Sequence, residues 1–366
     1  MPDETSPPAP LKEWFDESRY RSLAAELAAL SKGFRAQVFL DRTLEGLEER
    51  SLMQRLHQCA VAVEDAMPGS YKKQVEVLKK LAPRVGHNFV AIFLSDFVAT
   101  FGRAELEFSM EALRFFTPFG SAEFAVRPFL ASEPERAMAI VRTWTDDPDE
   151  HVRRLASEGT RPRLPWGMRL THLVRDPSPC APILDALKED PSLYVRKSVA
   201  NHLNDITKDH PAWVLERLEA WDLDSEPQRW IARHACRTLI KRGDARALAL
   251  MGFGAKPRVD AEFAVSPARL RLGKTLTLEA RLVSRSRTVQ TLAVDYVMHY
   301  VKALGGVFEK VFKWSEIELP PGSEVTLRKR QTLRDFTTRK HHAGHHLVEL
   351  QVNGQRLAQA GFDLRV

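Results

Sequence analysis

The chain is poor in the features that mark secreted, redox-active and membrane proteins. Cys59, Cys180 and Cys236 are the only cysteines in 366 residues and none stands in a C-x-x-C spacing, so neither a disulfide framework nor a thiol metal site is expected. The longest run free of Lys, Arg, Asp and Glu is eleven residues, from Val85 to Ser95, against the ~20 that a membrane-spanning helix requires. The first ten residues are acidic and proline-rich and lack the apolar run of a secretory signal. We therefore expect a cytoplasmic protein with a disordered tail over residues 1–10 and no membrane segment.

Motifs for several common chemistries are also absent. The sequence contains no GxxxxGK[ST], no HExxH and no GxSxG, and no GxGxxG follows a strand-like segment, so nucleotide hydrolysis, zinc-peptidase chemistry and dehydrogenation are unsupported. Four histidines gather at 341–346, but they stand in adjacent pairs, which points their side chains apart, and no carboxylate or cysteine stands beside them. We predict neither a metal nor a cofactor.

What the chain does have is positive charge, unevenly spread. The formal net charge of +6 divides into −6 over residues 1–150, +5 over 151–256 and +7 over 257–366, so the cationic part starts near Arg153. Such a long cationic stretch favours a polyanionic partner, and nucleic acid is the commonest one. The competing interpretation is that Lys and Arg only solvate helix and strand faces.

Apolar residues change their spacing near residue 256. From Leu11 to about Phe253 they recur with helical spacing between frequent prolines, which predicts a chain of short helices. After Lys256-Pro257 the period becomes two, and short alternating stretches separated by turns predict an immunoglobulin-like β-sandwich without cysteine. The clearest of these stretches begin at Ala261, Thr275, Leu292, Val325 and His346. We predict two domains, 11–256 and 257–366.

An internal repeat organises the helical part. DPDEHVRRLASE from Asp147 and DPSLYVRKSVAN from Asp190 align with a spacing of 43 residues, and RWIARHACRTLIKRGD from Arg229 resembles a degenerate third copy. A period of about 40–47 is typical of HEAT-like helical pairs, which stack because none buries its apolar face alone. We expect each Asp-Pro to start a helix, with Asp as the cap and Pro in the first turn. The predicted fold is an all-α HEAT-like repeat solenoid, with its repeated basic residues on a concave face, followed by an all-β immunoglobulin-like sandwich.

The segment LASEGTRPRLPWG, residues 155–167, carries the densest set of unusual residues. Glycines and prolines stiffen a loop after a repeat helix that Glu158 ends, Arg161 and Arg163 are available to phosphate, and Trp166 stands at the end of the loop. A plain linker between two helices needs none of these together. Taken singly, each residue has a structural alternative, in which Trp166 fills the inter-repeat core and Glu158 is a solvated helix end.

SEGTRPRLPW, together with VANHLNDITKDHP from Val199, resembles the AlkC family of HEAT-like DNA glycosylases, in the branch with a C-terminal immunoglobulin-like domain. The resemblance covers essentially the whole chain. It implies a monofunctional enzyme of base excision repair that removes cationic 3-methyladenine and 3-methylcytosine from duplex DNA. It also implies that the base is not flipped out, although flipping is the general rule for base-directed enzymes. The family's active-site positions fall on Glu123, Glu158, Trp166 and Asp205.

The expected chemistry agrees with that set. A base methylated at N3 already carries positive charge and leaves as a neutral molecule, so no general acid is required. The remaining task is to stabilise the oxocarbenium-like sugar and to orient a water, and carboxylates do both. We assign water activation to Asp205, lesion recognition to Trp166, and a negative field that selects charged lesions to Glu158 and Glu123. Two structural alternatives stay open, namely Asp205 as an ordinary helix-end acid and Glu123 bridged to Arg127.

Phosphate contacts are expected from basic residues around this segment and from a cationic turn of the sandwich, and such contacts position a duplex without reading it. The candidates are Arg153, Arg154, Arg161, Arg163, Arg169, Arg196, Lys197, Lys208, Arg339 and Lys340. The turn, TTRKHHAGHH, would let the two domains clamp a bent duplex. The sequence thus predicts a monomeric DNA glycosylase that acts on duplex DNA. The competing class is a non-catalytic HEAT-repeat scaffold that binds a protein partner, or DNA without cleaving it.

Overall fold

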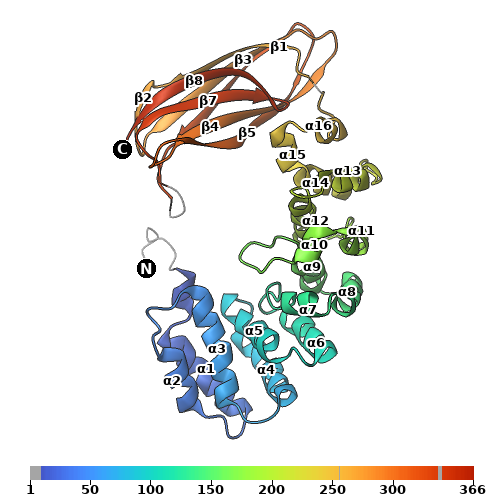
Figure 1. The fold of residues 1–366 in the computed structure, drawn as a ribbon, viewed down its shortest axis with the longest axis vertical. Coiled ribbons are helices and arrows are strands. Elements are labelled where there is room, and N and C mark those ends of the chain that lie inside the picture. Colours follow the sequence, from blue (N-terminus) through green and yellow to red (C-terminus); the bar gives the residue numbers. More distant parts are fainter. Residues whose placement is uncertain (1–9, 255, 337–339) are drawn as a thin grey trace. The chain divides into compact units, whose positions relative to one another are not determined.

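The computed structural model describes residues 10–254, 256–336 and 340–366, and the chain divides into two compact units (Figure 1). The first unit holds the chain up to His210 together with Leu223–Ile231. The second unit holds Pro211–Asp222 together with Ala232–Val366. The predicted tail, apart from Pro10, lies outside the described residues. Within the part of the chain that is described, no helix is both long and apolar enough to cross a membrane.

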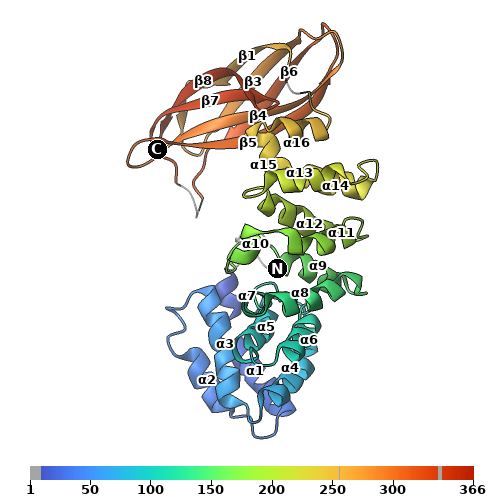
Figure 2. The same cartoon turned by 45° about the vertical axis from the view of Figure 1, so that its right-hand side comes forward.

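In its described residues, the first unit consists of helices joined by loops and contains no strand. Its α-helices are α1 (Glu17–Leu30), α2 (Ala36–Leu44), α3 (Leu52–Ala66), α4 (Tyr71–Val85), α5 (Ile92–Phe101), α6 (Leu106–Phe116), α7 (Arg127–Ser132), α8 (Pro134–Thr143), α9 (Glu150–Gly159), α10 (Thr171–Arg175), α11 (Ala181–Ala186) and α12 (Leu193–Ile206). Short 3-10 turns are η1 (Leu11–Trp14), η2 (Phe89–Ala91), η3 (Trp144–Asp146) and η4 (Ser178–Cys180). The helices stack roughly in chain order, and pairs such as α2 with α3 and α9 with α12 pack together (Figures 1 and 2).

The second unit combines short helices with a β-sandwich. Its helices are α13 (Pro211–Glu219), α14 (Glu226–Ala235), which crosses the division between the units, α15 (Arg237–Arg242) and α16 (Ala245–Leu250). Its strands are β1 (Val259–Ser266), β2 (Arg269–Arg271), β3 (Thr275–Ser284), β4 (Gln290–Val301), β5 (Val307–Leu319), β6 (Glu324–Thr332), β7 (Gly344–Val352) and β8 (Gln355–Arg365). The strands form one sheet in the order β1-β3-β6 and a second in the order β2-β8-β7-β4-β5. The predicted succession of helices followed by a β-sandwich is confirmed.

The sandwich core consists of side chains that alternate inward along the strands. Leu276 and Leu278 of β3 are fully buried, as is Met298 of β4, and they pack in one cluster with Val348 and Phe362. The five stretches singled out in the sequence correspond to β1, β3, β4, β6 and β7. The sequence gives no clear strand signal for β5, because most of its residues are partly or fully exposed and charged side chains interrupt its apolar pattern.

The last helical segments pack directly on the sandwich. Gln351 of β7 donates from Nε2 to the carbonyl of Lys241 at 2.9 Å, although the two residues lie 110 positions apart. The β7–β8 turn approaches the end of α15 so closely that a Cβ on Gly354 would lie 2.0 Å from Cα of Gly243, and both glycines have positive φ. The change from helix to strand therefore falls between α16 and β1, while the packing unit starts earlier, at Pro211.

The predicted repeat is visible in the structure, but its Asp-Pro pairs do not cap helices. The caps stand two residues further on, because Asp149 accepts from the amide of His151 before α9 and Ser192 accepts from the amide of Tyr194 before α12. Asp147 and Asp190 instead accept from the amides two residues ahead, at 2.9 and 2.8 Å. The expectation that these aspartates are caps was wrong. Each aspartate side chain instead stabilises the turn that leads into the helix, by accepting from the amide of the capping residue.

Each of these aspartates also joins one repeat to the preceding one. Arg114 of α6 donates to Asp147 at 2.6 Å, and Arg153 of α9 donates to Asp190 at 2.6 and 3.1 Å. The aspartates are buried, so these are charge-assisted contacts with little competing water. Arg153, Arg196 and Arg229 each donate to the carbonyls five and six positions before them, which confirms that Arg229 stands in a third copy.

Candidate functional site

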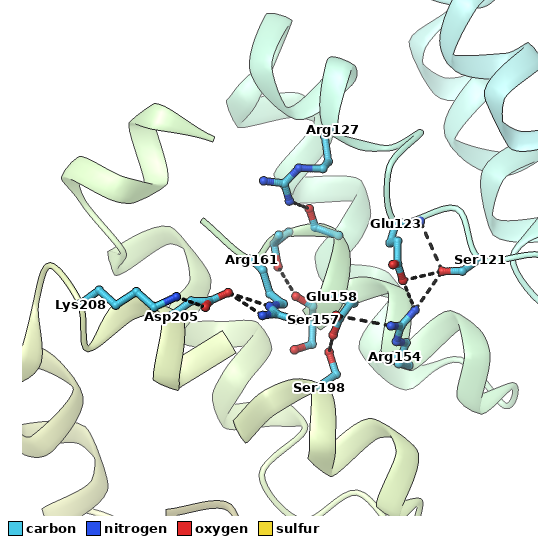
Figure 3. Close-up of polar contacts among 12 residues, drawn as sticks. Ser121, Glu123, Arg127, Arg154, Ser157, Glu158, Arg161, Ser198, Asp205 and Lys208 are labelled. Atoms are coloured by element: carbon cyan, nitrogen blue, oxygen red, sulfur yellow. Dashed lines mark hydrogen bonds and ion pairs between the residues drawn. The ribbon is translucent and has the colours of Figure 1, made fainter. Parts of the chain in front are cut away.

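Three predicted carboxylates, although distant in sequence, lie in one cluster of the first unit (Figure 3). Glu123 lies on the turn before α7, Glu158 in the last turn of α9, and Asp205 in the last turn of α12. Glu158 is 6% exposed and Asp205 is 4% exposed, whereas Glu123 is half-buried. The packing of α9 against α12 brings the last two together.

Glu123 is held by a serine and an arginine. Ser121 donates from Oγ to Oε2 of Glu123 at 2.8 Å, and Arg154 of α9 forms an ion pair with the same oxygen. Arg154 Nη1 also donates to Ser121 Oγ at 2.9 Å, so the three side chains form a closed set. The alternative pairing of Glu123 with Arg127 is not observed, because the Arg127 guanidinium donates to backbone carbonyls.

Arg161 bridges the other two carboxylates. It donates from Nη1 to Glu158 Oε1 at 2.6 Å, and from Nε and Nη2 to Asp205 Oδ2 at 2.8 and 2.7 Å. Glu158 Oε2 also accepts from Ser198 Oγ of α12 at 2.6 Å. Asp205 Oδ1 accepts from Lys208 Nζ at 2.9 Å. Every carboxylate oxygen of this pair therefore has a donor, and the Arg161 guanidinium, whose residue is 7% exposed, is shielded from solvent.

Acids and cations alternate through the cluster, in the order Glu123, Arg154, Glu158, Arg161, Asp205 and Lys208. Burial alone would lower the pKa of Arg154, but the carboxylates of Glu158 and Glu123 outweigh burial and raise the pKa. The arrangement keeps the carboxylates oriented, and in the unbound chain it leaves their charge offset by neighbouring cations.

Trp166 is prominently exposed. Its side chain does not fill the inter-repeat core, because the residue is 77% exposed and its backbone has φ of 65°. The loop around it is fixed by Arg127, which donates to the carbonyls of Met168 at 2.7 Å and Gly159 at 2.9 Å. A Cβ on Gly167 would stand 3.1 Å from Cδ2 of Leu164 and 3.3 Å from Cδ of Arg127, so a larger residue here would require both side chains to shift by a few tenths of an ångström. The pKa of Arg127 is lowered to about 10, mainly by burial and also by the nearby positive charge of Arg161.

The predicted phosphate-binding cations fall into different environments. Arg153 joins two repeats through Asp190, whereas Arg196 donates to carbonyls of the loop before its own helix. Arg154 and Arg161 lie inside the acid cluster. Arg163 pairs with Asp209 at 2.7 and 2.8 Å and keeps a partly exposed side chain. The remaining described candidates are exposed, and they are Arg169, Lys197, Lys208 and Lys340. Arg339 lies outside the described residues. In the described part of the chain, no group of three or more His, Cys, Asp or Glu could hold a metal ion.

Sequence reasoning missed two serines that bind the acids and the role of Arg127 in the adjacent loop. Ser121 and Ser198 bind Glu123 and Glu158, and Arg127, which is fully buried, supports the loop that carries Trp166. Serines are common at helix ends and on helix faces, so no pattern in a single sequence marks these two. Arg127 follows a helix-compatible apolar run and gives no signal of its burial.

Comparisons with known proteins bear on the same region. A family model for DNA alkylation repair enzymes matches residues 115–239, which include the acid cluster and Trp166. A model for the C-terminal Ig-like domain of the uncharacterised protein YhaZ matches residues 259–366. The Bacillus subtilis (strain 168) protein YhaZ, described as uncharacterized, is 38% identical over 349 residues, which is 95% of this chain and 97% of that protein.

A solved structure gives a further and more specific similarity. It is that of Pseudomonas fluorescens alkylpurine DNA glycosylase AlkC, bound to DNA containing an abasic site analog. That chain is 49% identical, with a TM-score of 0.95 over 98% of this chain and 100% of the other. These similarities identify the chain as a DNA alkylation repair protein. More specifically, the chain belongs to the AlkC family of alkylpurine DNA glycosylases, with the C-terminal YhaZ-type Ig-like domain.

Proposed function

We propose that the chain is a monofunctional DNA glycosylase that excises 3-methyladenine and 3-methylcytosine from duplex DNA in base excision repair, without flipping the base out. The observation that carries the proposal is the convergence of Glu123, Glu158 and Asp205 in one cluster, next to the loop that presents Trp166. The match of residues 115–239 to DNA alkylation repair enzymes supports it.

The reaction needs negative charge more than it needs a proton donor. A 3-methylated base is a cation that becomes neutral when the glycosidic bond breaks, so the positive charge passes to the sugar. Carboxylates stabilise that charge where it develops. A normal base is neutral and gains nothing from the same field before its bond breaks. In our proposal the acids favour cationic lesions over neutral bases once DNA binding removes part of the positive charge that offsets them.

Each predicted side chain has a role in this scheme. Asp205 orients the water that attacks the sugar, and Glu158 and Glu123 supply the surrounding negative field. Trp166, exposed on its loop, recognises the cationic base by a cation–π contact. These assignments rest on residue chemistry and on the resemblance to the family.

The contacts of Arg161 suggest a role other than phosphate binding. Its guanidinium is buried and holds Glu158 and Asp205 together, so we assign it a positioning role. Lys208, by contrast, has a side chain that is 44% exposed while its amine covers Oδ1 of Asp205. In our proposal a DNA phosphate draws Lys208 away and frees this oxygen for the attacking water. The proposed phosphate contacts are completed by Arg163, Arg169, Lys197, Lys340 and Arg339. Arg153 acts mainly between repeats, and Arg196 acts mainly within its own repeat.

Excision from methylated duplex DNA tests the proposal. The wild-type chain should release 3-methyladenine, and Asp205→Asn should lower the single-turnover rate by about 10²–10⁴-fold, because removing a positioned catalytic base costs that much. Asp209→Asn is a matched control, since Asp209 lies four positions on and pairs with Arg163 at the surface. It should keep the wild-type rate.

The two ways of failing are distinct. If the wild-type chain binds DNA but releases no base, the non-catalytic scaffold is correct and the enzyme proposal is wrong. If Asp205→Asn and Asp209→Asn both excise at the wild-type rate, the chain is a glycosylase in which Asp205 does not orient the water.

A further inference from the structure

The second unit contains a hollow of about 490 Å³ between two loops. One loop joins α16 to β1 and contributes Lys256 and Arg258, and the other joins β3 to β4 and contributes Arg287. The hydroxyls of Ser286 and Thr288 also line it, and none of its described lining residues is acidic. The hollow is therefore cationic and rich in hydrogen-bond donors.

The walls of this hollow are fixed by amide side chains. Gln290 accepts from the amide of Arg258 at 2.7 Å and donates to the carbonyl of the same residue at 3.1 Å, which locks the two loops together. Asn353 donates to the carbonyl of Gly254 at 2.8 Å and accepts from the amide of Ala293 at 2.8 Å. The backbone on both sides is thus held in place before any ligand arrives, which lowers the cost of binding.

The positive charge of the hollow is not cancelled locally. Asp260 lies two positions after Arg258 in the sequence, but its carboxylate accepts from Nε of Arg285 at 2.6 Å, so its charge is already offset. Lys256, Arg258 and Arg287 are exposed. Three cations that line one hollow, with no acidic residue among its described lining residues, repel one another, and an anion relieves that repulsion.

We infer that this hollow is a phosphate-binding site that takes a phosphodiester group of the DNA backbone, separate from the acid cluster of the first unit. Enclosed small-molecule sites are mostly apolar and bury most of their ligand, whereas this site is open and its side-chain donors are exposed. Such a site suits a solvated phosphate that belongs to a polymer. The inference rests on the proposed function, because that function supplies DNA as the polymer.

The test is the salt dependence of DNA binding by the full chain. Each neutralised phosphate contributes about 0.9 to the slope of log K against log salt. Because the hollow takes one phosphodiester group, Arg258→Gln combined with Arg287→Gln should reduce the slope by roughly 0.9. The affinity should fall equally for methylated and unmethylated duplexes of the same sequence, because a phosphate contact carries no base information.

The matched control removes the same charge elsewhere in the sandwich. Arg281 and Arg328 are exposed but do not line the hollow, and they pair with Glu324 at 2.5 Å and Glu279 at 2.6 Å respectively. Arg281→Gln combined with Arg328→Gln should therefore leave the slope unchanged. Equal losses in the two double variants would mean that only net charge counts, and would overturn the inference. A wild-type slope in the Arg258/Arg287 variant would also overturn it.

Two further measurements separate the possible failures. If the wild-type chain binds a nucleoside diphosphate in a titration, and the Arg258/Arg287 variant loses that binding but keeps wild-type DNA affinity, the hollow is a nucleotide site and the DNA inference is wrong. Excision by the wild-type chain is measured in the same series. Its absence would refute the proposed function, whereas excision with an unchanged salt slope would refute only this site.

Discussion

Replacing Arg161 by glutamine should separate a positioning role from a phosphate contact. The guanidinium makes three contacts of 2.6 to 2.8 Å with Glu158 and Asp205, and the substitution leaves two buried carboxylates without their shared cation. Removing one partner of a buried ion pair costs about 3–5 kcal/mol. Glu158 keeps Ser198 and Asp205 keeps Lys208, so we expect the lower end, about 3 kcal/mol. In a unit of this size that corresponds to a fall in Tm of roughly 6–12 °C.

The assay compares stability, DNA affinity and single-turnover excision in Arg161→Gln, Arg161→Lys and Arg163→Gln. Arg161→Lys keeps the charge but cannot serve both acids in the same geometry, so its excision rate should lie between the wild type and Arg161→Gln. Both Arg161 variants should bind unmethylated duplex with the wild-type salt slope, because the guanidinium is buried. Arg163→Gln should instead lower the slope by about 0.9 with little loss of stability, since its ion pair is near the surface. A lower slope together with an unchanged Tm in Arg161→Gln would refute the positioning role.

Three further predictions concern single side chains. Trp166→Ala should weaken binding to a duplex with a cationic abasic-site analog by about 2- to 30-fold, and Trp166→Phe should recover part of the loss. Neither variant should lower Tm, because Trp166 is 77% exposed. Equal affinities of Trp166→Ala and the wild type for this duplex would exclude a cation–π contact. His202 is fully buried, and its burial, together with the nearby charge of Arg161, lowers its pKa to about 3. The neutral imidazole therefore contributes to folding stability above pH 6.5, and this contribution is lost as pH falls towards 3. Thermal unfolding between pH 4 and 7 should therefore show a flatter acid limb in His202→Leu, and an unchanged limb would contradict this. Burial raises the pKa of Asp295 to about 6, so its contribution is greatest below pH 3.8 and is lost as pH rises through 6. Asp295→Asn should raise the unfolding temperature of the second unit at pH 7–8 and leave it unchanged at pH 4, where a gain at both pH values would point to packing instead.

Much of the architecture could be predicted because it depends on patterns that a single sequence displays. The change from helical to alternating spacing near residue 256 corresponds to the passage from α16 to β1. The 43-residue repeat is reflected in Arg153 and Arg196, which each donate to the carbonyl six positions earlier, near the starts of α9 and α12. These are local features, repeated or periodic, and they need no knowledge of which residues meet across the fold.

The site could be predicted only in part, because its contacts join repeats. The residue types of the cluster were visible, but nothing local shows that Arg161 lies between Glu158 and Asp205, which is 44 positions away from it. A basic residue beside a proline-rich loop has the same local sequence whether it faces phosphate or a buried carboxylate. The aspartates of the Asp-Pro pairs were misassigned for a similar reason, because the arginines that pair with them belong to the preceding repeat.

The stacking of repeats and the geometry of the acid cluster depend on the same pair of helices. Arg153 joins the N-terminal half of α9 to Asp190 before α12, while Ser198 and Asp205 contact Glu158 and Arg161 at the other end of α9. The two helices are thus fastened at both ends, so a rotation of one repeat against the next would separate the carboxylates. Residues that hold repeats together at one end therefore determine whether the acids can act together at the other, although they lie outside the acid cluster.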